Sequence, residues 1–286
     1  MLNFISVNDV DNINALVELA LKYKSNPFAD KAKGIGKRIG LLFLNPSLRT
    51  RISTQVAAAN LGMEAIVFMG QYFDILCVRT FPTLQNRQND YAEIVINQFI
   101  KYAGVPIVSL ESATLHPLQS LADVITIKET SSAFKRPKVV LTWAPHIKAL
   151  PQCVANSFAQ WVVAWGQAEF VITYPVGYEL DESFTKNATI NTNQNEALKN
   201  ADYVYVKNWS AYHNYGKMIC NSTDWMLTNE KLQVTNNAKV MHCLPVRRNV
   251  ELSDEILNGP NSLVTQQAGN RVWAAQAVLS EILKIL

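Results

Sequence analysis

Three short stretches of this sequence combine arginine, histidine, hydroxyl or amide side chains at points where an apolar run ends. The first is Ser-Leu-Arg-Thr-Arg at residues 47–51, which follows the apolar run 39–44 and opens a segment with helical spacing. Backbone N–H groups at a helix start attract anions, and the planar guanidinium of Arg49 suits a phosphate. With the hydroxyls of Ser47 and Thr50 as further donors, this stretch predicts an anion site.

The two arginines of this stretch are predicted to have different roles. Arg49 and Arg51 are two residues apart, so they cannot share one face of a helix. We expect Arg49 to meet the ligand and Arg51 to form a structural ion pair. The alternative is an ordinary N-cap at Asn45 or Ser47 followed by two solvated arginines, and the pattern alone does not separate the two. No glycine-rich nucleotide-binding signature is present.

The second stretch, residues 110–120, places a histidine and a glutamine just after an expected strand. The strand should end at Glu111, and His116 and Gln119 should open the next helix. Open α/β sheets bind ligands at the carboxyl ends of their strands. His116 could then donate to a carbonyl oxygen and Gln119 could hold an amide. The alternative is a helix-capping histidine and a surface glutamine.

The third stretch is His-Cys-Leu-Pro at residues 242–245, followed by Arg247 and Arg248. Backbone carbonyls before a proline can accept from an amide, and the arginines could hold a carboxylate. Cys243 could instead be a catalytic thiol. We discount that reading because nothing in the sequence ties a base to it.

Strand-like and helix-like runs that alternate along the whole chain must position these residues. The alternation, with helix-like runs such as 90–103 and 116–129, predicts an α/β protein with two domains, each a parallel sheet covered by helices. We expect a first domain at residues 1–130, a second at 131–267, and a C-terminal helix at 268–286 that packs back on the first.

One junction conflicts with this reading. The strand-like run 64–68 leads into the run 73–80 with too few residues between them for parallel neighbours. Either the two strands are not neighbours, or a loop expected after Phe68 is missing from this sequence. We favour the missing loop.

Composition excludes several function classes. The net charge of +3 is too small and too evenly spread to indicate nucleic acid. No apolar stretch approaches the ~20 residues that span a membrane, and the N-terminus has no export-signal pattern. The four cysteines show neither a CxxC pair nor zinc spacing, so we expect a cytoplasmic protein with reduced thiols and no metal site.

Taken together, Ser-x-Arg-Thr-Arg (47–51), His-Pro-x-Gln (116–119) and His-Cys-Leu-Pro (242–245) resemble the aspartate and ornithine carbamoyltransferase family, in order and spacing from end to end. Family members that act on free ornithine bind its α-ammonium group with an aspartate and a later Ser-Met-Gly. The corresponding region here, residues 201–212, lacks these residues. The stretches at 142–146, 207–209 and 242–249 instead resemble the branch that acts on N-acylated ornithine, N-succinylornithine first and N-acetylornithine second. An acylated α-nitrogen carries no positive charge, so a substrate of this kind needs no aspartate to bind it.

The resemblance implies a role for each matching residue. Carbamoyl phosphate would be held by Ser47, Leu48 through its backbone, Arg49, Thr50, Arg79, His116, Gln119, the carbonyls of Cys243 and Leu244, and Arg271. The acylornithine would be held by Glu111, His146, Lys207 and Arg247, with Asn156 as a weaker candidate. The catalytic set would be Arg79, His116, Arg49 and Thr50. Without the resemblance, Lys207 and His146 read as an ordinary surface lysine and loop histidine.

The resemblance also implies a reaction and an assembly. The δ-amine of an acylornithine would attack carbamoyl phosphate and release phosphate, in arginine biosynthesis and with no cofactor. Relatives form homotrimers in which the loop expected after Phe68 reaches a neighbouring active site and helps to recognise the acyl group. Two alternatives stay open, namely N-acetylornithine as the substrate and a carbamoyl-phosphate-binding protein without turnover.

Overall fold

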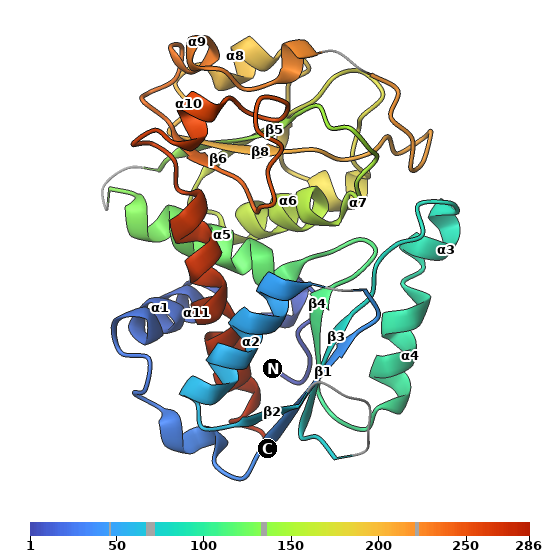
Figure 1. Cartoon of the computed structure of the whole chain (residues 1–286), viewed down its shortest axis with the longest axis vertical. Coiled ribbons are helices and arrows are strands. Elements are labelled where there is room, and N and C mark those ends of the chain that lie inside the picture. The colour runs from blue at the N-terminus through green and yellow to red at the C-terminus, as the bar shows by residue number, and fades with distance from the viewer. Residues whose placement is uncertain (46, 67–71, 133–135, 221–222) are drawn as a thin grey trace. The chain divides into compact units, whose positions relative to one another are not determined.

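The structure, a computed structural model, describes residues 1–45, 47–66, 72–132, 136–220 and 223–286 (Figure 1). These residues form two compact units. Unit 1 contains Met1–Thr83, Gln88–Glu129 and Gly269–Leu286, and unit 2 contains Leu84–Arg87 and Thr130–Ala268. The loop that we expected after Phe68 falls outside the described residues.

Unit 1 is built on a four-stranded parallel sheet. Its strands are β1 (Arg38–Phe43), β2 (Glu64–Ile66), β3 (Ile75–Arg79) and β4 (Ile107–Glu111), in the order β2-β1-β3-β4. Because β1 lies between β2 and β3, these two strands are not neighbours. Both strands nevertheless run parallel to β1, so the connection from β2 to β3 must still return from the carboxyl edge of the sheet to its amino edge, and the missing loop stays a prediction.

Helices cover both faces of this sheet. The helices wholly or mostly in unit 1 are η1 (Val7–Asp9), α1 (Ile13–Ser25), η2 (Lys31–Gly34), α2 (Leu48–Asn60), α3 (Arg87–Tyr91), α4 (Ile94–Tyr102), α5 (Pro117–Thr130) and α11 (Val264–Ile282). Figure 1 shows α4 on one side of the sheet and α2 with α11 on the other. The buried cluster of Val78, Ile96 and Ile107 fixes α4 against β3 and β4.

The helical run predicted at 90–103 is not one helix. It breaks between α3 and α4, where Glu93 adopts a left-handed backbone with φ 49°. The apolar periodicity alone gave no sign of the break, because the residues on either side of it still suit a helix.

Unit 2 is built on a five-stranded parallel sheet. Its strands are β5 (Lys138–Trp143), β6 (Glu169–Thr173), β7 (Thr189–Ile190), β8 (Tyr203–Lys207) and β9 (Lys239–Met241), in the order β7-β6-β5-β8-β9. Its helices are α6 (Cys153–Trp165), α7 (Glu182–Thr185), α8 (Gln194–Leu198), η3 (Thr223–Trp225), α9 (Asn229–Leu232) and α10 (Asp254–Leu257).

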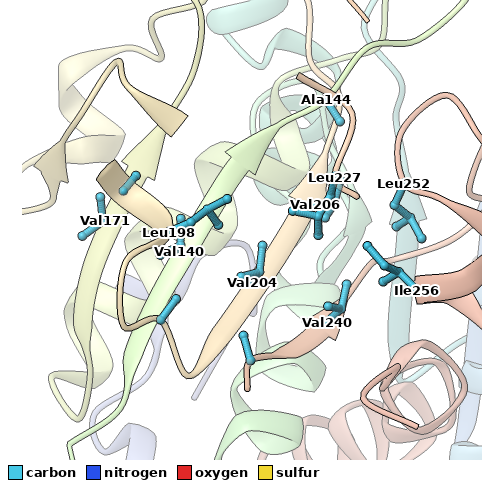
Figure 2. Packing of buried hydrophobic residues seen from close by; sticks show 13 residues of the cluster. Val140, Ala144, Val171, Leu198, Val204, Val206, Leu227, Val240, Leu252 and Ile256 are labelled. Atoms are coloured by element: carbon cyan, nitrogen blue, oxygen red, sulfur yellow. The ribbon is translucent and has the colours of Figure 1, made fainter. Parts of the chain in front are cut away.

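The core of unit 2 lies on both faces of this sheet. Figure 2 shows one layer, in which Val140, Val204 and Val240 on the strands meet Leu198 of α8 and Ile256 of α10. On α6, Phe158 makes edge-on ring contacts with strand residues Phe170 and Tyr205 at 5.8 and 4.5 Å. The predicted fold class, two domains each with a parallel sheet covered by helices, is confirmed.

The strand order gathers the predicted site residues at two sheet edges. In unit 1, β1, β3 and β4 are adjacent, and their carboxyl ends lead to Ser47, to Arg79 and to Glu111. In unit 2, the adjacent strands β5, β8 and β9 lead to His146, Lys207 and the 242–245 stretch. In both sheets the strand order changes direction next to these strands, which is where open α/β sheets bind ligands. No helix among the described residues is long and apolar enough to cross a bilayer.

Candidate active site

The start of α2 holds a cluster of hydroxyl and guanidinium groups. Ser47 is the N-cap residue, but its hydroxyl donates to Oγ1 of Thr50 at 2.9 Å instead of capping a backbone N–H. Nη2 of Arg271, from α11, also donates to that oxygen. Both Thr50 and Arg271 are buried. A buried cation therefore lies at the start of α2, where the first backbone N–H groups of a helix are available, as an anion site requires.

Arg49 and Arg51 both lie on the exposed side of this helix start. The prediction that Arg51 forms an ion pair is wrong within the described part of the chain, where its side chain has no acidic partner. The positive charge of Arg49 is one of those that lower the pKa of His116. Leu48 is exposed and offers its backbone N–H at the first helical position.

A buried ion pair joins β3 to β4. Nε and Nη2 of Arg79 donate to Oε2 of Glu111 at 2.9 and 2.5 Å, while Nη1 donates to the carbonyl of Asn45 at 3.1 Å. A register shift between Val78 and Arg79 sets Arg79 opposite Glu111. Irregularities of this kind re-aim side chains at sheet edges. The pair thus fixes the Arg79 guanidinium at the carboxyl edge of the sheet.

His116 is buried next to this ion pair. Its Nε2 lies 4.0 Å from Oε2 of Glu111, too far for a hydrogen bond, and its buried Nδ1 has no hydrogen-bond partner in the described ranges. Burial lowers the pKa of His116 to about 3; Glu111 opposes this shift, and the charges of Arg271, Arg79 and Arg49 add to it. His116 is therefore a neutral imidazole at physiological pH.

Gln119 lies one turn into α5 with its amide orientation fixed. Its Nε2 donates to Oδ1 of Asp123 at 2.8 Å, and both side chains are buried. Its Oε1 is buried and lacks a hydrogen-bond partner among the residues described. The carboxylate of Asp123 thus leaves Gln119 with an available acceptor, which suits a ligand NH2 group.

In unit 2, the predicted residues lie on three neighbouring segments. Lys207 is the last residue of β8 and is buried, with 7% exposure. Nδ1 of His146, just after β5, lies 2.9 Å from the carbonyl of Lys148, and Arg247 is exposed. Asn156 is fully buried in α6. Among the described residues, no hydrogen bond or ion pair joins His146 or Arg247 to Lys207.

The 242–245 stretch is held by a buried acid that the sequence reading missed. Nε2 of His242 donates to Oε1 of Glu251 at 3.2 Å, because Nδ1 of the same ring accepts from the N–H of Leu244 at 2.9 Å. The N–H of Arg247 donates to Oε2 of Glu251 at 2.8 Å. Leu244 has φ 55° and precedes a cis peptide bond to Pro245. Glu251 therefore sets the path of the backbone whose carbonyls are the predicted acceptors.

Glu251 remains ionised although it is fully buried. Burial by itself would raise its pKa, but the hydrogen bond from His242, the nearby charge of Lys207 and the N–H of Arg247 lower it to about 2. Since the usual value is 4.5, the ionised form stabilises the native state above pH 4.5, and that contribution is lost as the pH falls through the folded pKa.

Replacing this acid with its amide should therefore destabilise the protein. In Glu251→Gln one of the two N–H donors meets an NH2 group, and we expect the free energy of unfolding at pH 7 to fall by about 3 kcal/mol. The difference from the wild type should shrink below pH 4.5, where the wild-type acid loses its advantage. Urea unfolding from pH 7 to pH 3 measures both effects. Glu255→Gln, at an exposed residue of α10, is the control and should change little.

The predicted residues thus form two groups. In unit 1 the structure brings together Ser47, Arg49, Thr50, Arg79, Glu111, His116 and Arg271, with Gln119 three residues beyond His116. In unit 2 it associates Lys207 with the 242–247 segment through Glu251. The sequence reading missed Asp123 and Glu251, and only the i,i+4 spacing of Gln119 and Asp123 could have indicated the first. No group of three or more metal-binding side chains occurs in the described part of the chain.

Comparison with known proteins identifies the family. Residues 2–129 match the description "Aspartate/ornithine carbamoyltransferase, carbamoyl-P binding domain", and residues 152–282 match "Aspartate/ornithine carbamoyltransferase, Asp/Orn binding domain". The chain is 43% identical over 319 positions to N-succinylornithine carbamoyltransferase of Bacteroides fragilis strain 638R, covering 100% of both chains. It is 31% identical over 332 positions to N-acetylornithine carbamoyltransferase of Xylella fastidiosa strain Temecula1, covering 98% of both.

Solved structures agree with these sequence matches. A crystal structure of N-acetyl-L-ornithine transcarbamylase superposes with a TM-score of 0.89 at 27% identity, covering 99% of this chain and 100% of that one. Both family domains match in order, and the two relatives are covered over 100% and 98% of their length. The chain therefore belongs to the aspartate/ornithine carbamoyltransferase family.

Proposed function

We propose that this enzyme transfers the carbamoyl group of carbamoyl phosphate to the δ-amine of N-succinyl-L-ornithine and releases phosphate, as a step of arginine biosynthesis. The observation that carries the choice of substrate is the difference in identity. N-succinylornithine carbamoyltransferases of two Bacteroides species match at 43% and 41%, whereas N-acetylornithine carbamoyltransferases match at 31% or less. All of these alignments cover at least 94% of the chain.

The cluster of unit 1 supports the carbamoyl phosphate half of the proposal. Ser47, the N–H of Leu48, Arg49, Thr50 and Arg271 would hold the phosphate. The Arg79 guanidinium would reach both the phosphate and the carbonyl oxygen, and the acceptor Oε1 of Gln119 suits the carbamoyl NH2. As the amine attacks, negative charge develops on the carbonyl oxygen, where Arg79, His116 and Thr50 would stabilise it.

The segments of unit 2 support the acylornithine half. Lys207 and Arg247 are cations suited to the α-carboxylate, with His146 and Glu111 as further contacts. The backbone of Cys243 and Leu244, fixed through His242 and Glu251, would accept from the carbamoyl NH2. Catalysis would then consist of positioning and charge stabilisation, while an oxygen of the departing phosphate takes the proton of the attacking amine. No cofactor is required.

The pH dependence of turnover tests the role of His116. Because its pKa lies near 3, His116 should not titrate between pH 5 and 9, and it donates as a neutral ring. We expect kcat/KM to rise with pH as the attacking amine loses its proton, without an inflection near pH 6.5. Burial of the neutral ring costs stability only at low pH, as the pH falls from 6.5 toward 3 and the unfolded chain takes up a proton. A wild-type inflection near pH 6.5 that disappears in His116→Asn would contradict this assignment.

A homotrimer in the cytoplasm is the assembly and location that we propose. Leu48, Ile52 and Val56 of α2 are exposed and follow each other at i, i+4 and i+8, so they form one apolar stripe on the surface of unit 1. Such a stripe suits contact with another copy of the chain. Sedimentation equilibrium tests the trimer directly.

Two alternatives remain, and both concern the acyl group or the loop. The alignment to the Bacteroides fragilis protein spans 319 positions, more than the 286 residues of this chain, so that relative contains residues with no counterpart here. If these include the expected loop after Phe68, either the acyl preference or turnover itself could differ. N-acetylornithine is the second candidate substrate, and a carbamoyl-phosphate-binding protein without turnover is the more distant one.

A single assay separates these possibilities. The protein is incubated with carbamoyl phosphate and, in separate reactions, with N-succinyl-L-ornithine, N-acetyl-L-ornithine or L-ornithine, and the ureido product is measured. We expect product with the succinyl compound. Preference for the acetyl compound would move the substrate to the other branch. Binding of carbamoyl phosphate without any product would favour the protein without turnover.

A further inference from the structure

The loop that carries His116 is buried and short. It connects β4 to α5, and Ser112, Thr114 and Leu115 in it are at most 9% exposed. The N–H of Ser112 donates to the carbonyl of Leu115 at 2.8 Å, and the N–H of Leu115 donates back to Oγ of Ser112 at 3.2 Å. This turn sets the start of α5 and with it the directions of His116 and Gln119.

A carboxylate from a distant part of the sequence holds this loop. Oε1 of Glu93, between α3 and α4, accepts from Oγ of Ser112 at 2.5 Å and from the N–H and Oγ1 of Thr114 at 2.7 and 2.6 Å. Its Oε2 lies 3.3 Å from the N–H of Ala113, which also donates to it. One side chain thus satisfies four donors on three successive loop residues.

The backbone of Glu93 is in an unfavourable conformation that serves this contact. Its φ of 49° and ψ of 38° lie in the left-handed region, which non-glycine residues rarely adopt. Glu93 occupies the N-cap of α4, yet its side chain makes no capping hydrogen bond and turns to the loop instead. Strained residues that persist in a fold often belong to functional sites.

We propose that Glu93 is a positioning residue for the carbamoyl subsite. It touches no substrate; it holds the 112–115 loop so that His116 and Gln119 meet the carbamoyl group. This inference rests on the proposed function of unit 1. Loss of the carboxylate leaves buried donors of Ser112 and Thr114 unsatisfied, and the loop must move to find other partners.

The test uses two probes that read different parts of the site. Phosphonoacetamide carries both a phosphonate and an amide, so it can occupy the phosphate and carbamoyl subsites together, and it cannot transfer a carbamoyl group. Inorganic phosphate occupies the phosphate subsite alone. We expect Glu93→Gly to weaken phosphonoacetamide binding at least tenfold in calorimetry and to leave phosphate binding within twofold. The same variant should lower kcat and raise the KM for carbamoyl phosphate, with little change in the KM for the amine substrate.

Further variants separate the carboxylate from the backbone. Glycine relieves the left-handed strain at residue 93, so a role of the backbone alone predicts wild-type behaviour in Glu93→Gly. Glu93→Gln keeps one acceptor oxygen for Ser112 and Thr114 and should partly restore binding. If Glu93→Gly fails to fold, Glu93→Gln and Thr114→Val, which removes one of the loop donors, still test the idea. Asn237→Gly, at another left-handed position outside the site, is the control and should match the wild type.

The outcomes distinguish this inference from the proposed function. Unchanged phosphonoacetamide binding in folded Glu93→Gly, with a wild type that binds this probe more tightly than phosphate, would overturn the role of Glu93 alone. A wild type that binds both probes equally would overturn the carbamoyl subsite and the role of Glu93 with it. Equal weakening of both probes would show that Glu93 supports the whole fold of unit 1, which also contradicts the proposal.

Discussion

Arg79→Met is expected to lower kcat by at least 100- to 1000-fold and to destabilise the protein by about 3–5 kcal/mol. The two effects have different causes. Turnover falls because a donor to the developing oxyanion is lost, and such a donor acts only in the transition state. Stability falls because the carboxyl group of Glu111, 7% exposed, would lose the two hydrogen bonds that Arg79 now donates and would stay buried without its partner.

A double variant separates these causes. Adding Glu111→Gln to Arg79→Met removes the uncompensated buried charge, so most of the lost stability should return. Turnover should stay low, because the guanidinium is still absent and Glu111 is itself a proposed contact of the acylornithine. Urea unfolding measures the first quantity and phosphate release measures the second.

The control for these Arg79 and Glu111 variants is the exposed ion pair of Arg38 and Glu64, whose side chains are 53% and 66% accessible. Arg38→Met should cost less than about 1 kcal/mol and should leave turnover unchanged. If Arg79→Met were no less stable than Arg38→Met, the buried pair would not be the reason that β3 and β4 meet as they do. If the double variant regained turnover, Arg79 would act only through Glu111.

Residues that directly follow an apolar run could be placed from the sequence. Ser47, Arg79 and Glu111 each lie at or just after the carboxyl end of a strand, and strands with parallel neighbours deliver such residues to a common edge. The helix opening at Pro117 follows from the same reasoning, whereas Lys207, which without the resemblance reads as a surface lysine, is buried at the end of β8. The spacing of apolar residues, and the position of each residue just after an apolar run, were sufficient to place Ser47, Arg79 and Glu111 at the edge of a sheet.

The residues that hold the site in shape could not be placed this way. Glu93 and Glu251 accept from backbone N–H groups of loops, and a sequence does not show which distant carboxylate such a loop will recruit. The same limit explains the error about Arg51, because the ion pair that we expected needed a partner brought close by the fold. Irregular backbone, such as the left-handed Glu93 between two helices, leaves no periodic trace.

Arg49→Lys is expected to cost about 3–4 kcal/mol of transition-state stabilisation, or a 100- to 1000-fold loss in kcat/KM for carbamoyl phosphate. Lysine keeps the charge but presents it as a point, whereas a guanidinium can donate two parallel hydrogen bonds to a phosphate. Since Arg49 is exposed, its replacement should leave the unfolding free energy almost unchanged.

Arg51→Lys is the matched control, because Arg51 is exposed on the same first turn of α2 and has no ion pair within the residues that the structure describes. Steady-state kinetics with varied carbamoyl phosphate should separate the two variants by two to three orders of magnitude in kcat/KM. Inhibition by inorganic phosphate should weaken in Arg49→Lys alone, because Arg49 and not Arg51 is the proposed phosphate contact. Near-normal turnover in Arg49→Lys would mean that the backbone N–H groups of α2, Thr50 and Arg271 hold the phosphate without it. An equal loss in both variants would instead point to the total charge of the helix start, and not to the guanidinium fork of Arg49.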